Sequence, residues 1–171
     1  GQSWGGYQVA YLITRTHMFK AAEAGAPVSN MTSAFGGIRW ESGSSRQGQY
    51  EEGQSRIGRN LWEAPELYIS NSALFKLPEV KTPLLIMHND ADGAVPWYQG
   101  IEMFMGLRRL GKPVWMLEYN NEAHNLKERR NRKDLTIRLQ QFFDYYLKGA
   151  PEPEWMKSGI PILRKGQYFA Y

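Results

Sequence analysis

Hydrophobic and polar positions follow two different periods along this chain, and the periods predict a series of strands and helices. Residues 84–88 form a short continuous apolar run, which is typical of a strand that is buried on both faces of a sheet, and the run at residues 114–119 predicts the next strand. Apolar residues at helical spacing follow the first run over residues 97–110 and the second over residues 134–147, and Gly149 stands where the last helix should end. The second half of the chain is therefore predicted to run strand, helix, strand, helix.

The first half is less regular. Residues 7–25 have a helix-compatible pattern, and the short apolar segment 26–30 is interpreted as the end of a buried strand. Residues 32–60 form a polar, glycine-rich excursion without a sustained period, yet it carries aromatic and aliphatic side chains that a flexible linker does not need. We expect a partly helical insertion that lies over one end of the sheet. Residues 61–75 have helical spacing that is broken by Pro65.

Strands that alternate with helices predict the α/β class, with a parallel sheet and helices on both of its faces. Functional side chains in such sheets gather at the carboxyl ends of the strands. We expect residues 1–171 to form one domain, in which the excursion 32–60 lies over the functional end and residues 150–171 form a C-terminal extension.

Composition excludes several other classes. With 42% hydrophobic and 13% aromatic residues, the chain of 171 residues is predicted to fold rather than to be disordered. It has no cysteine, which excludes disulfides and thiolate metal sites, and no apolar stretch approaches the ~18 residues of a membrane span. Much of the net charge of +4 comes from residues 127–133, where no aromatic residues are interleaved. We therefore expect a solvated surface, with neither nucleic acid nor membrane as a partner.

The first candidate for chemistry is the segment Gly1-Gln2-Ser3-Trp4-Gly5-Gly6. Its pattern, G-x-S-x-G-G, resembles the nucleophile elbow of α/β-hydrolases, in which the serine occupies a sharp, strained turn between a strand and a helix. The flanking glycines allow the backbone to pass close to neighbouring segments of the same chain. The N–H of the residue after the serine points to the place where an oxyanion forms. The pattern predicts Ser3 as the nucleophile and the Trp4 N–H as an oxyanion donor.

A serine nucleophile needs a base, and the base needs an acid that orients it. In α/β-hydrolases the three residues follow one another in the order Ser, Asp or Glu, His. Of the three histidines, only His124 comes after an acidic loop at a strand end, because His17 and His88 precede those loops. Asp90 and Asp92 both lie in the loop after the first apolar run, and position alone does not choose between them.

Three motifs together resemble the prolyl oligopeptidase family of serine peptidases. The segment HNDADGAVP is similar to the family's H-G-x-x-D-x-x-V-P, GQSWGGYQ is similar to its elbow G-x-S-x-G-G-Y, and NEAHNL is similar to its histidine loop. The resemblance extends from the first residue to about residue 147, in the family's order and spacing. It implies a partial α/β-hydrolase fold that lacks the N-terminal strands.

The resemblance also implies an activity and a catalytic triad. Asp92 rather than Asp90 would be the triad acid, Ser3 would attack a peptide carbonyl, and His124 would relay the proton. The expected function is that of a serine-type peptidase that works through an acyl-enzyme, without a cofactor. A metal site built from the same aspartates and histidines is the alternative, but the ordered serine elbow favours the triad.

Substrate-binding residues are suggested by position within the family pattern. In the family, aromatic residues line the pocket that holds the substrate side chain before the cut bond. The matching region of this chain contains Met31, Phe35 and Trp40, which we predict to bind substrate. The alternative is that these residues pack in the core or in a lid. Asn89 departs from the family's glycine at a turn position, where we expect a local adjustment. Ala94 stands where dipeptidyl-peptidase members often have an asparagine, so that contact with substrate is not implied here.

The resemblance implies partners that lie outside this chain. We expect a C-terminal portion of a longer peptidase, whose N-terminal β-propeller and remaining hydrolase strands would complete it, with peptide as substrate and an exported, periplasmic or secreted location. The portion alone is expected to have little activity. Its exposed sheet edge could pair with a second copy. An esterase or acylaminoacyl hydrolase of the same fold, and a non-catalytic binding module on this scaffold, remain the alternatives.

Overall fold

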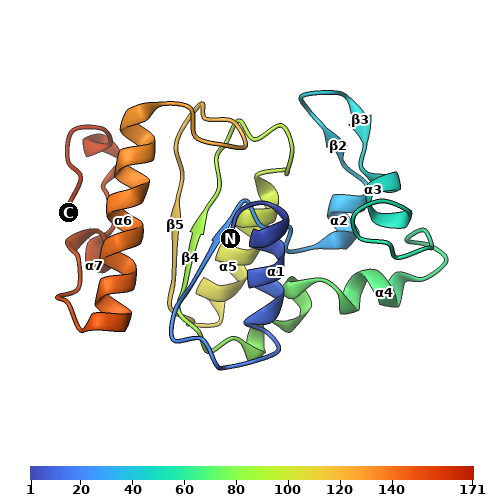
Figure 1. The fold of residues 1–171 in the computed structure, drawn as a ribbon, viewed down its shortest axis with the longest axis horizontal. Helices are drawn as coiled ribbons and strands as arrows, with labels where there is room; N and C mark the ends of the chain where they lie inside the picture. Colours follow the sequence, from blue (N-terminus) through green and yellow to red (C-terminus); the bar gives the residue numbers. More distant parts are fainter. The chain divides into compact units, whose positions relative to one another are not determined.

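The computed structural model describes residues 1–171, which divide into two compact units, Gly1–Asn125 and Leu126–Tyr171 (Figure 1). Unit 1 contains the sheet and all the predicted catalytic residues. Unit 2 contains the longest helix and the C-terminal extension. None of the helices combines the length and the apolar character that crossing a membrane requires.

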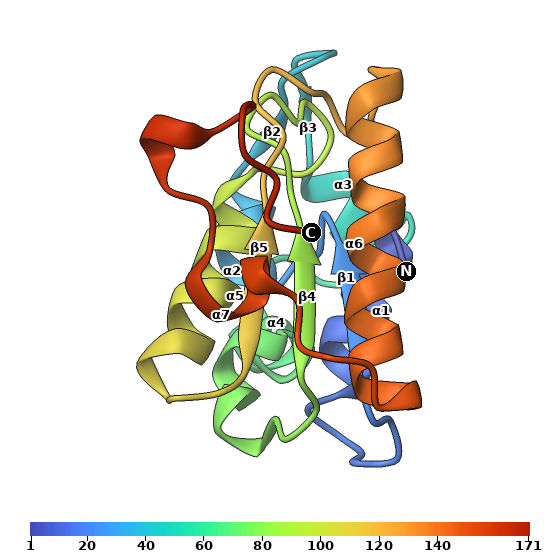
Figure 2. The same cartoon turned by 90° about the vertical axis from the view of Figure 1, so that its left-hand side faces the viewer.

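A three-stranded parallel sheet forms the centre of unit 1. Its strands are β1 (Ala22–Gly25), β4 (Leu84–Met87) and β5 (Val114–Leu117), in the order β1-β4-β5. Figure 2 shows the three strands running in the same direction. All four residues of β4 are buried, which confirms the prediction of a strand that is covered on both faces. The parallel sheet of the α/β class is likewise confirmed.

Two helices and a 3-10 helix pack on one face of this sheet. They are α1 (Trp4–Leu12), η1 (Ala73–Glu79) and α5 (Tyr98–Arg109) (Figure 1). Alternate residues of a strand point to the same face, and one apolar cluster joins these helices to the residues that β1 and β4 direct toward them. The cluster includes Ala10, Ile13, Leu77, Met103 and Leu107 from the helices and Ala24, Leu84 and Ile86 from the strands.

The excursion and the segment after it form short elements around a second apolar cluster. These elements are α2 (Met31–Phe35), the antiparallel pair β2 (Ile38–Arg39) and β3 (Ser44–Ser45), α3 (Gln47–Glu51) and α4 (Pro65–Ser70). Met31, Phe35, Tyr50 and Tyr68 are buried together in this cluster. The helical content expected of the excursion is therefore confirmed. Pro65 begins α4 rather than interrupting it, because the first helical position has no N–H partner to lose.

Two predicted boundaries in the first half are wrong. The helix expected over residues 7–25 is formed by Trp4–Leu12, and the strand expected at residues 26–30 is formed instead by Ala22–Gly25. The run Ala21-Ala22-Glu23-Ala24-Gly25 has helix-forming residues, but its backbone pairs with β4 in parallel register. Ala24 is fully buried there, so tertiary pairing overrides the local preference.

Unit 2 is built on α6 (Arg129–Lys148), followed by α7 (Glu154–Ser158) and the short 3-10 helix η2 (Ile162–Arg164). Helix α6 begins five residues before the predicted start at residue 134 and ends, as predicted, at Gly149, whose φ of 71° is left-handed. The extension is tied to α6 by side-chain hydrogen bonds. The Trp155 Nε1–H donates to Gln141 Oε1 at 2.8 Å, and the Arg138 guanidinium donates to the Phe169 carbonyl at 2.9 Å.

Candidate active site

Ser3 occupies the turn between a short β-bridge and helix α1. The bridge pairs Gln2 with Gly25 at the end of β1, and the Ser3 N–H donates to the Gly25 carbonyl at 2.8 Å. The backbone of Ser3 has φ 60° and ψ −116°, a conformation that costs a non-glycine residue energy and persists only where its surroundings enforce it. This is the strained turn that a nucleophile elbow requires.

The glycines around Ser3 allow chain segments to approach one another closely. A Cβ on Gly6 would collide with the Gly25 carbonyl oxygen, and a Cβ on Gly1 would lie 2.8 Å from the Gly5 carbonyl carbon. Gly5, in contrast, faces open space. Two of the three motif glycines are therefore needed for close packing of the elbow against itself and against β1.

Trp4 is the first residue of α1, so its N–H has no acceptor within the helix. The amino end of a helix favours negative charge, and no acidic side chain occupies the first turn of α1 to neutralise it. A free N–H at this position is what an oxyanion donor needs.

Asp92 and His124 come together from the loops after β4 and β5. The His124 Nδ1 lies 2.8 Å from Asp92 Oδ2, while Asp92 Oδ1 accepts the N–H groups of Ala94 at 2.9 Å and Val95 at 2.8 Å. Asp92 is only 5% exposed. Burial by itself would raise the pKa of this carboxyl, but hydrogen bonds from His124, His88 and the Val95 N–H outweigh it and hold the pKa well below its usual range.

His88 is a second imidazole beside the same carboxylate. It is fully buried at the end of β4, and its Nε2 lies 3.1 Å from the Val95 carbonyl and 3.4 Å from Asp92 Oδ2. A carbonyl oxygen only accepts, so Nε2 carries the proton and shares it between the two oxygens. Gly100 makes room for the other edge of the ring, because a Cβ there would lie 2.5 Å from His88 Nδ1. His17, in contrast, is exposed on the segment after α1.

Asp90 and Asp92, which position in the sequence left undecided, have different partners. The carboxylate of Asp90 accepts the Asn121 N–H at 2.7 Å and the Asn120 side-chain amide at 2.8 Å. It binds the loop that carries His124, whereas Asp92 contacts the imidazole itself.

Two amide side chains that the sequence analysis did not select also bind the histidine loop. Gln2 Nε2 donates to the His124 carbonyl at 2.9 Å, and Asn89 Nδ2 donates to the Ala123 carbonyl at 2.7 Å. The bond from Gln2 places the elbow beside the histidine loop. The only sequence signal for these contacts was that Asn89 departs from the glycine of the similar motif; nothing in the local pattern marked Gln2.

A cavity of about 300 Å³ opens beside the elbow. Trp4 and Tyr7 of α1, Met31 of α2 and the excursion residue Ile57 are among its lining residues. Phe35 lies in the aromatic cluster nearby, 5.1 Å from Tyr68 between ring centroids, and is 1% exposed. Of the three predicted substrate-binding residues, Met31 lines the cavity and Phe35 lies in the apolar cluster that contains Met31.

Trp40, the third residue, lies at the tip of the β2–β3 hairpin with 73% of its surface exposed. The hairpin contacts the loop of Asp92, because the Glu41 N–H donates to the Gly93 carbonyl at 3.4 Å. Arg46, which is 1% exposed, donates to the Ala94 carbonyl from the same excursion and to Tyr50 Oη at 3.2 Å. A buried arginine therefore attaches the excursion to the acid loop, although the polar sequence pattern gave no sign of it.

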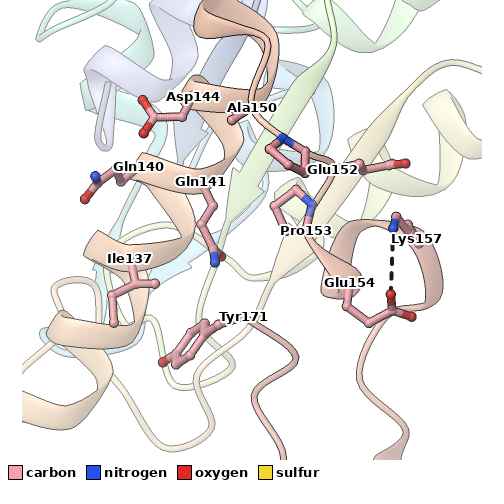
Figure 3. A pocket seen from close by; sticks show the side chains of 11 residues that line it. Ile137, Gln140, Gln141, Asp144, Ala150, Glu152, Pro153, Glu154, Lys157 and Tyr171 are labelled. Carbon is pink, nitrogen blue, oxygen red and sulfur yellow. Dashed lines mark ion pairs between the residues drawn. The ribbon is translucent and has the colours of Figure 1, made fainter.

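Unit 2 has a cavity of its own, of about 540 Å³, between α6 and the segment that follows it (Figure 3). Its polar lining includes Asp144, Glu154, Lys157 and Tyr171. Two of its carboxylates are paired with lysines, Asp144 with Lys148 at 2.7 Å and Glu154 with Lys157 at 3.9 Å.

Comparison with known proteins assigns this arrangement to a family. The sequence model of the prolyl oligopeptidase family, peptidase S9, matches residues 1–150, and the chain belongs to that family. The uncharacterized peptidase YuxL of Bacillus subtilis is 29% identical over 151 residues, which are 86% of this chain and 22% of that protein. Human acylamino-acid-releasing enzyme is 32% identical over 135 residues, 75% of this chain and 17% of the enzyme. The chain thus spans about a fifth of the length of these relatives.

Two solved structures of similar fold are acylaminoacyl peptidases. An acylaminoacyl peptidase in complex with Z-Gly-Gly-Phe-chloromethyl ketone superposes with a TM-score of 0.76 at 25% identity, over 94% of this chain and 25% of that one. The acylaminoacyl peptidase of Pyrococcus horikoshii gives a TM-score of 0.73 at 24% identity, over 94% of this chain and 26% of that one. The predicted partial α/β-hydrolase fold is therefore confirmed.

Proposed function

We propose that the full-length protein containing this chain is a serine peptidase, in which Ser3, His124 and Asp92 form the catalytic triad. The observation that carries the proposal is the hydrogen bond of 2.8 Å between His124 Nδ1 and the buried Asp92 carboxylate. The strained backbone of Ser3 and the family's peptidase relatives support it.

The hydrogen bond assigns a role to each imidazole nitrogen. An ionised carboxylate only accepts, so the proton of neutral His124 lies on Nδ1 and the lone pair lies on Nε2. In the proposed reaction Nε2 takes the proton of the Ser3 hydroxyl as its oxygen attacks the peptide carbonyl. The Trp4 N–H stabilises the resulting oxyanion, and the protonated imidazole then gives its proton to the leaving amine. Water, activated by the same nitrogen, hydrolyses the acyl-enzyme.

Peptide substrates are proposed to bind over the cavity beside the elbow. Met31 and Trp4 are placed to contact the side chain before the cut bond, with Phe35 as support behind them. Trp40, on the exposed hairpin, is proposed to contact substrate from the side of the acid loop. The remaining strands, the second oxyanion donor and a β-propeller would come from the rest of the full-length protein.

A second candidate function is the release of acylated amino acids from peptides. It is favoured by the names of relatives, because the human protein at 32% identity is an acylamino-acid-releasing enzyme. The elbow and the Asp92–His124 pair serve both reactions equally, and an esterase would use them in the same way.

The test is to compare peptide, N-acylated peptide and simple ester substrates with the full-length protein and with its Ser3→Ala variant. We expect peptide hydrolysis by the wild type, and a loss of at least about 10³-fold in kcat on removal of the nucleophile. Ser42→Ala, a change at an exposed serine of the β2–β3 hairpin, is the matched control. Ester turnover without any peptide cleavage would contradict the peptidase assignment, and full activity in Ser3→Ala would contradict the triad.

A further inference from the structure

The two peptide groups on either side of the His124 Cα are each held by an amide side chain from a different loop. Gln2, which precedes Ser3, donates to the His124 carbonyl at 2.9 Å, and Asn89, at the start of the acid loop, donates to the Ala123 carbonyl at 2.7 Å. We propose that Gln2 and Asn89, here termed the amide clamp, are positioning residues that hold the His124 imidazole between Ser3 and Asp92. This inference rests on the proposed triad.

The geometry of the clamp explains why both members are needed. The Ala123 carbonyl belongs to the peptide plane before the His124 Cα, and the His124 carbonyl belongs to the plane after it. Each peptide group is rigid, so fixing both planes fixes φ and ψ of His124 and therefore the direction of its Cα–Cβ bond. Asp92 then has to orient only the ring, through Nδ1. Backbone and ring are thus held by the two loops between which the histidine works.

The side chain of Gln2 is positioned for this role by Gly25, at the end of strand β1. A Cβ on Gly25 would collide with Gln2 Oε1, so the side chain of Gln2 lies in the space that the glycine leaves free. The bridge between Gln2 and Gly25 fixes the backbone of Gln2 at the same point. With its oxygen beside Gly25, the amide of Gln2 directs its NH₂ group to the His124 carbonyl. A carbonyl oxygen only accepts hydrogen bonds, so the NH₂ group must be the donor in this contact.

Asn89 is confined by burial, because it is 1% exposed, and its carbonyl accepts the Asp92 N–H at 3.4 Å. The next residue, Asp90, adds two hydrogen bonds to the loop that carries His124, one from the Asn120 side chain and one from the Asn121 N–H. Asn121, in the turn before His124, has a φ of 62°. This backbone conformation costs a non-glycine residue energy, and contacts from other loops stabilise it. The acid loop therefore sets both the charge beside the imidazole and the position of its backbone.

Loss of the clamp is expected to change the chemical step more than substrate binding. Neither amide lines the cavity beside the elbow, so KM should stay near its wild-type value. A displacement of about 1 Å at a catalytic group can cost about 10²-fold in rate. We expect Gln2→Met and Asn89→Ala each to lower kcat about 10- to 100-fold, and the double variant to lower it further, because each residue holds a different peptide plane.

The experiment measures kcat, KM and the rate of fluorophosphonate labelling for these variants of the full-length protein, all expressed per folded molecule. Gln2→Met keeps the length of the side chain and removes its amide, and with it the donor to the His124 carbonyl. Gln8→Met makes the same change at an exposed site on α1 and is expected to leave all three quantities unchanged. The resonance of the His124 Nδ1 proton, which reports its bond to Asp92, should broaden or shift in the two clamp variants and not in the control.

The outcomes separate the clamp from the triad. Lower kcat and slower labelling at constant KM, with the Nδ1 resonance perturbed, support the clamp. Wild-type kcat in both Gln2→Met and Asn89→Ala, in a protein that Ser3→Ala inactivates, would overturn the clamp and leave the proposed function standing. Activity that survives Ser3→Ala would overturn the proposed function, and the clamp with it.

Discussion

At the scale of single residues, Asp92 has the most exacting environment in the site. Its two oxygens face two backbone N–H groups and two imidazoles, and it is almost fully buried. The carboxylate stays ionised there because each of these neighbours donates a hydrogen bond to it. Asp90, two residues earlier, is half-buried and binds a backbone N–H and a side-chain amide instead.

Asp92→Asn is expected to lower kcat by about 10⁴-fold, because an amide NH₂ beside Nδ1 would favour the wrong tautomer of His124. Steady-state kinetics on the full-length protein measure this loss. Asp90→Asn, a change of the same kind in the same loop, should cost far less, since Asp90 does not contact the imidazole. Equal losses in the two variants would contradict the assignment of Asp92 as the acid.

Asp92→Asn should also change how the free energy of unfolding depends on pH. The pKa of Asp92 is held below its usual range in the folded protein, so the carboxylate stabilises the fold fully above the ordinary aspartate pKa of about 3.9. That contribution is lost as the pH falls toward the folded pKa. The stability difference between wild type and Asp92→Asn should therefore be largest near neutral pH and shrink below about pH 4.

At the scale of elements, the site depends on how closely helix α1 crosses the end of β1. Gly6 and Gly25 are the contact point, and the backbone before the turn is bonded to Gly25 on both sides of Gln2, through the Gly1 carbonyl and the Ser3 N–H. The strain of Ser3 is maintained by these contacts rather than by Ser3 itself.

Gly6→Ala is expected to destabilise the protein by about 1–3 kcal/mol, because the added methyl group would collide with the Gly25 carbonyl oxygen. Gly5→Ala is the matched control, since its methyl group would enter open space within the first turn of the same helix. Thermal unfolding of the two variants measures the difference. Equal midpoints for Gly6→Ala and Gly5→Ala would contradict the close approach.

The elements show which features the sequence could predict. The apolar runs at β4 and β5, and the glycine after α6, carry local signals, and their predictions are confirmed. Strand β1 has no such signal, because Ala22 and Ala24 favour helix and become a strand only by pairing with β4. The contacts of Gln2 and Asn89 join residues that are 122 and 34 positions apart, so no local pattern could reveal them.

At the scale of the whole molecule, topology explains only why the two loops meet. Parallel strands end at the same edge of a sheet, so the loops after β4 and β5 lie close together, and Asp92 and His124 meet there. The choice of Asp92 over Asp90 depends on the resemblance to the family's motif. The chain covers about a quarter of the peptidase structures that it resembles. We therefore propose that substrate choice depends on the full-length protein, in which this chain supplies the nucleophile, the base and the acid.

The most direct test of that claim is to label the full-length protein with a fluorophosphonate and to locate the adduct by mass spectrometry. We expect a single modified serine, Ser3, with labelling abolished in His124→Ala. An adduct on another serine, or peptide hydrolysis by a protein in which Ser3 never reacts, would contradict it.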